Sequence, residues 1–329
     1  MAVDAARAAN ATRLLILRRD NIGDLVCTTP LIAALRAQLP GAWLGAVVTT
    51  YNAEVLAGNP ALDEIFVYEK LKHRTGSLLS HVRSRLGQRS RLRARRFDCV
   101  LVPAPSAQAL KLARSLKPVR VLASPTGFPS RLHEVERVFE LGRSLGVDGK
   151  AGLLQLFPDA KKQAELRQQL GAGPFVAIHL SARRPAQRWP LERYAALAAG
   201  IAKEARVILL WAPGAADNPR HPGDDAAAAE VLRAAANPRV VPVATADLKT
   251  LIAALSLADC VICPDGGAMH LAAALGKPVV ALFGDSPVER WRPWRVPHRV
   301  LCPASKNLAD LELRPVLQAF AELRGGTAP

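Results

Sequence analysis

Short apolar runs alternate with helix-like segments along most of the chain, and this alternation restricts the possible folds more than any other feature. The runs that favour strands are 14–17, 43–48, 65–68, 99–102 and 119–122, and then 175–180, 207–210, 240–243, 259–263 and 279–283. Strands that alternate with helices are typical of parallel sheets, because each helix carries the chain back to the start of the next strand. The alternation therefore predicts an α/β fold of doubly wound, Rossmann-like sheets.

The two series of strands predict two domains. The chain has 329 residues, which is enough for two domains that each bury a core. A glycine-bearing, irregular stretch separates the series, so we expect a first domain at 1–150 and a second at 151–307. The C-terminal segment, 308–329, contains a helix that we expect to pack back toward the first domain. Loops at the carboxyl ends of the strands would then face a ligand cleft between the domains.

The formal net charge is +16 at pH 7, which favours polyanionic partners such as nucleic acid, anionic lipid or phosphorylated glycan. No apolar run approaches the ~18 residues of a membrane span, and the N-terminal cluster 14–17 is too short for a signal-peptide core. The five cysteines are scattered, which indicates a reduced, cytoplasmic protein. Cys260 and Cys263 form a CxxC without a second Cys or His pair, so we interpret them as buried thiols rather than zinc ligands.

Residues 264–284, PDGGAMHLAAALGKPVVALFG, form the most informative local motif. A strand stops at Pro264 and a helix starts within a few residues, so unpaired backbone N–H groups and the positive end of the helix dipole face outward. Gly266 and Gly267 would let a phosphate approach these N–H groups closely. Asp265 suits an N-cap or a hydrogen bond to a sugar hydroxyl. Any doubly wound fold contains such a unit, so the local pattern leaves a ligand role and a structural role equally open.

The first strand leads into RRDNIGDLVCTTP at 18–30, which lacks the GxGxxG dinucleotide fingerprint. Gly23 can take unusual backbone angles, so Asp24 would lie at the tip of the turn as a candidate general base. An aspartate in such a turn more often caps the following helix. From this loop alone, capping is the favoured interpretation.

The first strand of the second domain leads into HLSARRPAQRWP at 179–190. Its arginines, Arg183, Arg184 and Arg188, suit a pyrophosphate whose charge grows as it leaves. A solvated basic loop is the simpler alternative. A carboxylate on one domain and phosphate-binding groups on the other together indicate sugar transfer from a nucleotide donor to a hydroxyl.

Four segments resemble glycosyltransferase family 9, the heptosyltransferases of lipopolysaccharide core synthesis. They are RRDNIGDLVCTTP, HEVERVFELGRSLGV at 133–147, RWPLERYAALA and PDGGAMHLAAALGKPVVALFG, and they cover most of the chain in the right order. The resemblance implies a GT-B fold, with two Rossmann-like domains that face a central cleft. It also implies inverting transfer without an essential metal or cofactor, an ADP-activated heptose donor, and a lipid-linked, phosphorylated glycan acceptor.

The resemblance also assigns roles to individual residues. It implies that Asp24 is the base that takes the proton of the acceptor hydroxyl, which reverses the preference for capping. The implied acceptor-side residues are Asn21, Gly23 and Thr28. The implied donor and nucleotide-binding residues are Ser181, Arg184, Gln187, Arg188, Asp265, Gly266, Gly267, Met269 and His270. Core packing is the alternative for Met269, and a bond to a neighbouring loop is the alternative for His270.

Two positions depart from the family pattern on the donor side. Family members commonly carry Lys two residues before the Trp-Pro pair, where this chain has Gln187, so Arg184 or Arg188 would have to meet the donor phosphate. Ser or Thr often follows the motif aspartate, where this chain has Gly266. Two alternatives therefore stay open: a family 9 transferase with a different donor sugar, and a nucleotide-sugar or glycan-binding protein that has lost catalysis.

The stretch 70–96 contains ten Lys or Arg residues and no acid, with leucines interspersed. A basic amphipathic helix of this kind can lie against anionic headgroups, so we expect either peripheral attachment at the inner membrane or recognition of a phosphorylated acceptor. A solvated basic face is an equal alternative. The stretch has no Phe, Tyr or Trp to stack bases, which argues against nucleic acid as a partner.

Overall fold

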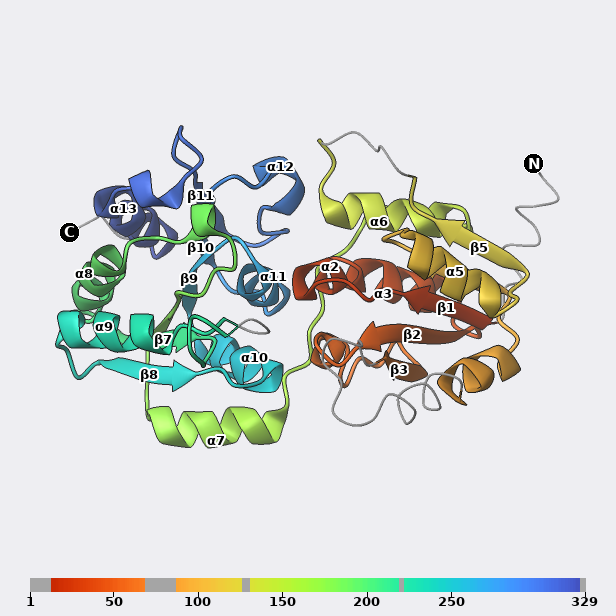
Figure 1. Cartoon of the computed structure of the whole chain (residues 1–329), viewed down its shortest axis with the longest axis horizontal. Helices are drawn as coiled ribbons and strands as arrows, with labels where there is room; N and C mark the ends of the chain where they lie inside the picture. The colour runs from red at the N-terminus through yellow and green to blue at the C-terminus, as the bar shows by residue number, and fades with distance from the viewer. Residues whose placement is uncertain (1–12, 69–86, 126–130, 219–221, 326–329) are drawn as a thin grey trace. The chain divides into compact units, whose positions relative to one another are not determined.

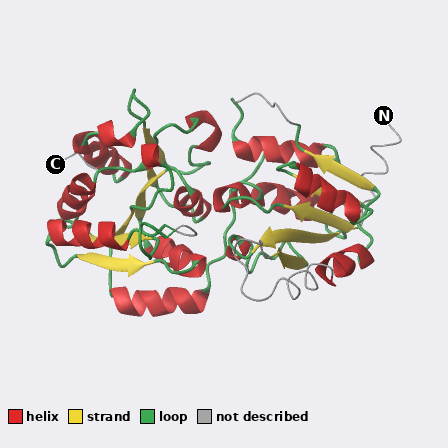
Figure 2. Cartoon of the chain, viewed as in Figure 1, coloured by secondary structure: helices red, strands yellow, loops and turns green. Residues whose placement is uncertain are grey.

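The computed structural model describes residues 13–68, 87–125, 131–218 and 222–325 and divides the chain into two units, Met1–Phe157 and Pro158–Pro329. Each unit contains one sheet flanked by helices (Figure 2). The boundary falls a few residues after the expected position near residue 150. Most of the basic stretch 70–96 lies outside the described residues.

The first unit is built on a five-stranded sheet in the order β3-β2-β1-β4-β5 (Figure 1). All neighbouring strands are parallel. The strands are β1 (Arg13–Leu17), β2 (Trp43–Thr49), β3 (Glu64–Tyr68), β4 (Cys99–Val102) and β5 (Arg120–Ala123). The helices are α2 (Ile22–Val26), α3 (Thr29–Gln38), η1 (Ala53–Val55), α5 (Ala107–Ser115) and α6 (Glu134–Arg143), and residues 87–94 are also helical.

The second unit is built on a six-stranded sheet in the order β11-β10-β9-β6-β7-β8, which is also parallel throughout. Its strands are β6 (Phe175–His179), β7 (Arg206–Trp211), β8 (Val240–Ala244), β9 (Cys260–Pro264), β10 (Val279–Leu282) and β11 (His298–Leu301). Its longer helices are α7 (Ala160–Leu170), α8 (Leu191–Ile201), α9 (Asp225–Ala235), α10 (Leu248–Leu257), α11 (Gly267–Ala274) and α13 (Leu313–Leu323). Its short helices are η3 (Pro185–Gln187), α12 (Val288–Trp291) and η4 (Leu308–Asp310).

Both sheets reverse their strand order beside their first strand. In the first unit the chain runs outward from β1 to β2 and β3 and then returns to place β4 on the other side of β1. In the second unit β9 returns to the other side of β6 in the same way. Ligands of doubly wound sheets bind outside the carboxyl ends of the strands at such a switch point. The two switch points therefore mark β1 with β4, and β6 with β9, as the places to look for a site.

Each unit has its own hydrophobic core. The first core includes Leu15, Val47 and Phe97, all buried, and the second includes Ile178, Leu209 and Ile262. Cys260 and Cys263 are buried in β9, which agrees with their interpretation as structural thiols.

The C-terminal helix α13 packs against α8, β10 and β11 of the second unit. Val316 and Phe320 of this helix are buried in the core of that unit. The expected packing of segment 308–329 toward the first domain stays a prediction.

Helix α11 ends where Gly276 predicts. Gly276 has φ +71°, the left-handed conformation that favours glycine, and the N–H of Lys277 donates to the carbonyl of Ala272 at 3.0 Å. No helix among the described residues has the length and apolar character needed to cross a bilayer.

Candidate functional site

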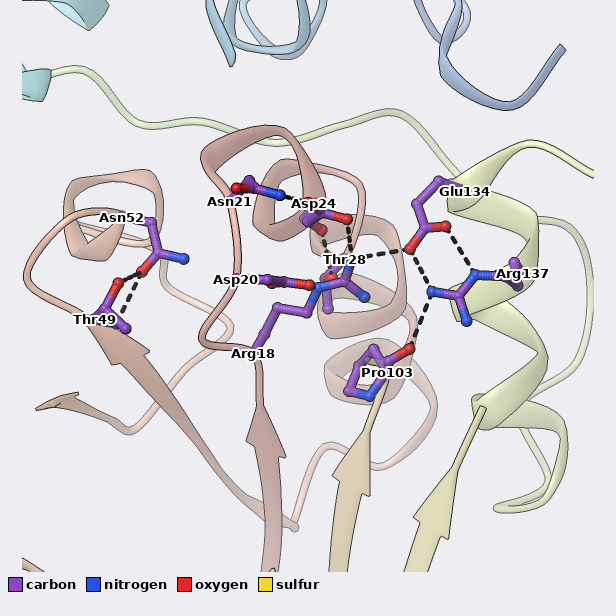
Figure 3. A network of polar contacts seen from close by, with 10 residues as sticks. All are labelled: Arg18, Asp20, Asn21, Asp24, Thr28, Thr49, Asn52, Pro103, Glu134 and Arg137. Carbon is purple, nitrogen blue, oxygen red and sulfur yellow. Dashed lines mark hydrogen bonds and ion pairs between the residues drawn. The ribbon is translucent and has the colours of Figure 1, made fainter. Parts of the chain in front are cut away.

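The segment after β1 places a charged cluster at the first switch point (Figure 3). Asp24 lies within the short helix α2 rather than at the tip of a loop, and Gly23 is a buried residue of the same helix without a positive φ. The prediction that Gly23 provides an unusual turn is therefore wrong. The helix itself positions Asp24, because α2 begins just after Asn21 and Asp24 is its third residue. From there the carboxylate reaches Arg18, the first residue after β1.

The carboxylate of Asp24 is held by two side chains. Arg18 donates from Nη2 to Oδ1 at 2.7 Å, and Asn21 donates from Nδ2 to Oδ2 at 2.8 Å. Thr28 donates to the backbone carbonyl of Asp24 at 2.9 Å, and no side chain caps helix α3. The capping alternative for Asp24 is therefore wrong. The Asp24 side chain as a whole is 14% exposed.

Arg18 is the centre of this cluster and is only 1% exposed. Besides Asp24, its guanidinium donates from Nε to Asp20 at 3.0 Å and from Nη2 to Glu134 at 2.9 Å. Sequence alone did not indicate Arg18 as a site residue. An arginine directly after a buried apolar strand is the signal that could have identified it, because a buried charge requires partners.

Glu134 enters the cluster from α6, 116 residues further along the chain. The start of α6 is fixed by a capping box, in which His133 Nδ1 accepts from the N–H of Val135 and Glu136 accepts from the N–H of His133. Arg137, one turn along α6, donates from Nε to Glu134 at 2.8 Å and also donates to the carbonyl of Pro103 at the end of β4. The cluster therefore joins the two strands of the switch point.

Burial and charge together set the protonation of this cluster. Burial lowers the pKa of Arg18, but the carboxylates of Asp20, Asp24 and Glu134 outweigh it and raise that pKa above its usual range. Burial raises the pKa of Asp20 to about 6 against the opposing effect of Arg18. Burial would also raise the pKa of Glu134, but its bonds with Arg137 and Arg18 lower it to about 2. Arg18 and Glu134 are therefore charged at neutral pH.

A second polar cluster lies at the carboxyl ends of β6, β9 and β10. Gln187 donates from Nε2 to Asp265 at 2.9 Å and to Ser286 at 2.8 Å. Arg184 donates to the hydroxyl of Ser286 and to Asp285, the latter at 3.2 Å. The structure thus brings together three of the predicted donor-side residues: Arg184, Gln187 and Asp265. Ser286, which is 8% exposed, was not indicated by the sequence.

Other predicted donor-side residues have partners outside this cluster. The hydroxyl of Ser181 accepts from the N–H of Ala212 at 2.9 Å, and Arg188 pairs with Asp224 at 3.2 Å. Asp224 also faces His179, whose pKa falls to about 4 because burial of the ring outweighs this neighbouring charge. Two arginines of the loop, Arg184 and Arg188, thus pair with different carboxylates, Asp285 and Asp224.

Helix α11 begins at two glycines, and the side chains that follow them are buried. Gly266 is extended, with φ 163°, and a Cβ at this position would meet no atom within 4 Å. Met269 is fully buried, which supports the core-packing alternative, and His270 is 3% exposed with its ring edge-on to Trp291 at 5.9 Å between centroids. Gly267 is the first residue of the helix, and the first bond within it runs from the N–H of His270 to the carbonyl of Gly266, so the N–H groups of residues 266–269 have no acceptor within the helix.

No group of three or more His, Cys, Asp or Glu side chains suited to a metal ion occurs in the described parts of the chain. The expectation of metal-independent chemistry stays a prediction.

Two parallel, doubly wound α/β units with polar loops at their switch points define a GT-B fold, which confirms the fold expected from the sequence. The central cleft expected between the domains stays a prediction. Residues 111–318 match the family model of glycosyltransferase family 9 (heptosyltransferase). This match spans more than half of the chain, and the chain belongs to glycosyltransferase family 9.

Individual relatives agree with this assignment. The chain is 22% identical to lipopolysaccharide heptosyltransferase 3 of Escherichia coli K12, over 83% of this chain and 82% of the relative. A family 9 glycosyltransferase from Veillonella parvula has a similar structure, with a TM-score of 0.81 at 19% identity, over 97% of this chain and 99% of that one. Escherichia coli heptosyltransferase WaaC, solved with ADP, has a TM-score of 0.75 at 20% identity, over 94% and 99% of the two chains.

Proposed function

We propose that this glycosyltransferase is inverting and moves a heptose from ADP-heptose to a lipopolysaccharide core or a related glycan. Two relatives support the donor and the acceptor class: the similar WaaC structure contains ADP, and the similar Escherichia coli protein is a lipopolysaccharide heptosyltransferase. The reaction needs a base for the acceptor hydroxyl and groups that stabilise the departing diphosphate.

Asp24 is the base in this proposal. The acceptor oxygen attacks C1 of the donor sugar, the bond between C1 and the diphosphate oxygen breaks, and the hydroxyl proton passes to the carboxylate of Asp24. The nucleoside diphosphate leaves with the electron pair of the broken bond. Arg18 and Asn21 hold one lone pair on each carboxylate oxygen, which leaves the others available for the proton. Asn21, Gly23 and Thr28 would shape the acceptor side around it.

The donor half of the proposal uses the second unit. The N–H groups of Gly266 and Gly267 and the dipole of α11 would receive the diphosphate, with Arg184 beside them. Gln187 and Asp265 would face the sugar or ribose hydroxyls, while Ser181, Arg188, Met269 and His270 would support the surrounding loops. The donor is a substrate, and the proposal includes no resident cofactor or metal.

The observation that carries this proposal is the partly exposed side chain of Asp24 at a switch point, with its carboxylate held by Arg18 and Asn21. We expect Asp24→Asn to bind ADP as well as the wild type in a thermal-shift titration and to lose transfer by about 10²–10⁴-fold. Glu140→Gln, an exposed change on α6, is the control and should keep wild-type transfer. Full transfer by Asp24→Asn would remove Asp24 as the base.

A second candidate is a nucleotide-sugar or glycan-binding protein of the same fold without catalysis. The bonding of Gln187 to Asp265, in place of a lysine that could meet a phosphate, is the observation that favours it. Release of nucleotide from a panel of nucleotide sugars, with and without a lipopolysaccharide extract, separates the candidates. Thermal stabilisation by a nucleotide sugar without any release would favour the binding protein.

We also propose a cytoplasmic location with peripheral attachment to the inner membrane, where a lipid-linked acceptor would be presented. The basic residues of the first unit and the net charge of +16 support this. Nucleic acid is not part of the proposal.

A further inference from the structure

The charged cluster after β1 contains more groups than a general base needs. A single nitrogen, Nη2 of Arg18, donates both to Asp24 at 2.7 Å and to Glu134 at 2.9 Å. Glu134 is fully buried and Arg18 nearly so. Burying a cation is costly unless carboxylates surround it, so this arrangement is a specific one.

The cluster connects Asp24 to the frame of the first sheet (Figure 3). Pro103 at the end of β4 accepts from Arg137, Arg137 holds Glu134, Glu134 holds Arg18, and Arg18 holds Asp24. Both ends of this series are fixed, one by strand β4 and the other by the end of β1. Arg18 therefore has little freedom to rotate, and Oδ1 of Asp24 has a fixed position.

Glu134 also shares the charge of Arg18. If Arg18 faced only Asp20 and Asp24, its full charge would stabilise their ionised forms and weaken Asp24 as a proton acceptor. A third carboxylate on the same nitrogen reduces that effect. Arg18 thus fixes the position of the Asp24 carboxylate and also stabilises its negative charge. Glu134 offsets the second effect.

Resting on the proposed role of Asp24 as the base, we propose that Arg18 is a positioning residue that orients Asp24 and that Glu134 is the anchor that tunes the strength of this base. Neither residue contacts the reacting atoms in this proposal. Helix α6 becomes part of the catalytic apparatus through Glu134, although it lies more than a hundred residues from Asp24 in the sequence.

Other titratable and charged groups lie near Asp24 or on elements packed against its helix. Any test of pH dependence must take their titration into account. Asp20 and Arg18 lie on the segment after β1, and Glu134 and Arg137 lie on α6. Cys27 at the end of α2 is a buried thiol whose pKa is raised by burial. Helix η1, which packs against α2, carries Glu54.

The test measures ADP release from ADP-heptose in the presence of a lipopolysaccharide core acceptor. It compares the pH profile of kcat/KM between the wild type and three variants. Arg18→Met removes the cation, so the acidic limb should move to higher pH by at least about 1 unit. Glu134→Gln removes the competing anion and should move the limb to lower pH. Arg18→Lys keeps the charge but loses the planar fork, so we expect the limb to stay while kcat falls about tenfold or more.

The matched controls are Arg143→Met and Glu140→Gln on the exposed side of α6, which should leave the limb and the rate unchanged. Carbon-13 titration of the Asp24 carboxyl, identified by its loss in Asp24→Asn, should show the same opposite shifts without a substrate. If Arg18→Met does not fold, Glu134→Gln and Arg18→Lys still decide the matter.

Profiles of Glu134→Gln and wild type that superimpose, by kinetics and by carbon-13 titration, would overturn the inference. Transfer retained by Asp24→Asn would instead overturn the proposed function. The two failures are therefore distinguishable.

Discussion

Gln187 is one of the two departures from the family pattern, and its contacts are specific. Where family members commonly carry a lysine, the amide of Gln187 is 6% exposed and donates to both Asp265 and Ser286. The amide of Gln187 is neutral, so it can bond to both Asp265 and Ser286 without adding a buried positive charge. A lysine at this position would instead bury an ammonium group as an ion pair with Asp265. Gln187 consequently holds Asp265 in place, and Arg184, which also bonds to Ser286, is nearly half exposed.

Gly266 is the other departure, and its surroundings give a prediction. Its backbone is extended and its Cβ position is open, so Gly266→Ser should fold without strain. Serine is also favoured at the N-cap, so we expect stability within about 0.5 kcal/mol of the wild type or slightly above it. The new hydroxyl would face the proposed diphosphate position and change the ranking of nucleotide sugars in a thermal-shift panel.

Gly276, at the other end of α11, provides the matched control for that serine substitution. It also has an open Cβ position, but its φ is +71°. Gly276→Ser should therefore lose about 1–2 kcal/mol of unfolding free energy because of backbone strain alone. Equal stability losses at both positions, measured by urea denaturation, would contradict the description of Gly266 as unstrained.

At the level of elements, α6 and the segment after β1 should respond to pH in opposite directions. The pKa of Glu134 is about 2 when folded and 4.5 ordinarily, because Arg137 and Arg18 outweigh its burial, so its stabilisation is complete above 4.5 and is lost as the pH falls toward 2. The pKa of Asp20 is raised to about 6 by burial, so its contribution to stability decreases as the pH rises from 3.8 to 6.

Denaturation of wild type, Glu134→Gln and Asp20→Asn between pH 3 and 7 tests this. The stability difference between wild type and Glu134→Gln should shrink below pH 4.5. The unfolding free energy of the wild type should fall as the pH rises toward 6, and this fall should be absent in Asp20→Asn. Parallel curves for all three proteins would mean that the cluster does not couple folding to protonation as described.

The same elements show what sequence could predict. The strands of the two series are confirmed, since most of them are compact apolar runs, and Gly276-Lys277-Pro278 ends a helix as predicted. Helix α7 was missed because it is mostly polar and buries only Leu166 and Leu170, and β11 was missed because it is a short edge strand containing His298 and Arg299.

The site was predictable only in its local parts. Asp24, Arg184, Gln187 and Asp265 follow strands, so their places near the switch points could be predicted from the sequence, whereas the roles predicted for them came from the family resemblance. The bonds from Arg18 to Glu134 and from Arg184 to Ser286 join residues 116 and 102 positions apart. No spacing rule within one segment links such residues, since only the strand order brings their loops together.

At the scale of the molecule, several exposed basic residues of the first unit lie on the segments that lead into the amino ends of β4 and β5. Residues 87–94 are helical and bury Leu92, so their arginines point outward. Segment 117–120 runs beside residues 97–98, with the N–H of Val119 donating to Phe97 and that of Arg120 donating to Asp98. Val119, which lies between Lys117 and Arg120 in the sequence, is 77% exposed. An apolar tip within a basic surface is the arrangement that suits an anionic lipid interface.

This surface predicts binding to vesicles that contain anionic phospholipid. Arg91→Glu/Arg93→Glu should weaken that binding by about tenfold or more at low salt, because each basic residue near the surface contributes about 1 kcal/mol. Lys161→Glu/Arg233→Glu changes the net charge equally on exposed helices of the second unit and should bind almost normally. Sedimentation with vesicles at two salt concentrations measures both. Equal losses in the two variants would show that net charge, and not this surface, attracts the lipid, and equally tight binding to duplex DNA would show that the surface does not select a membrane.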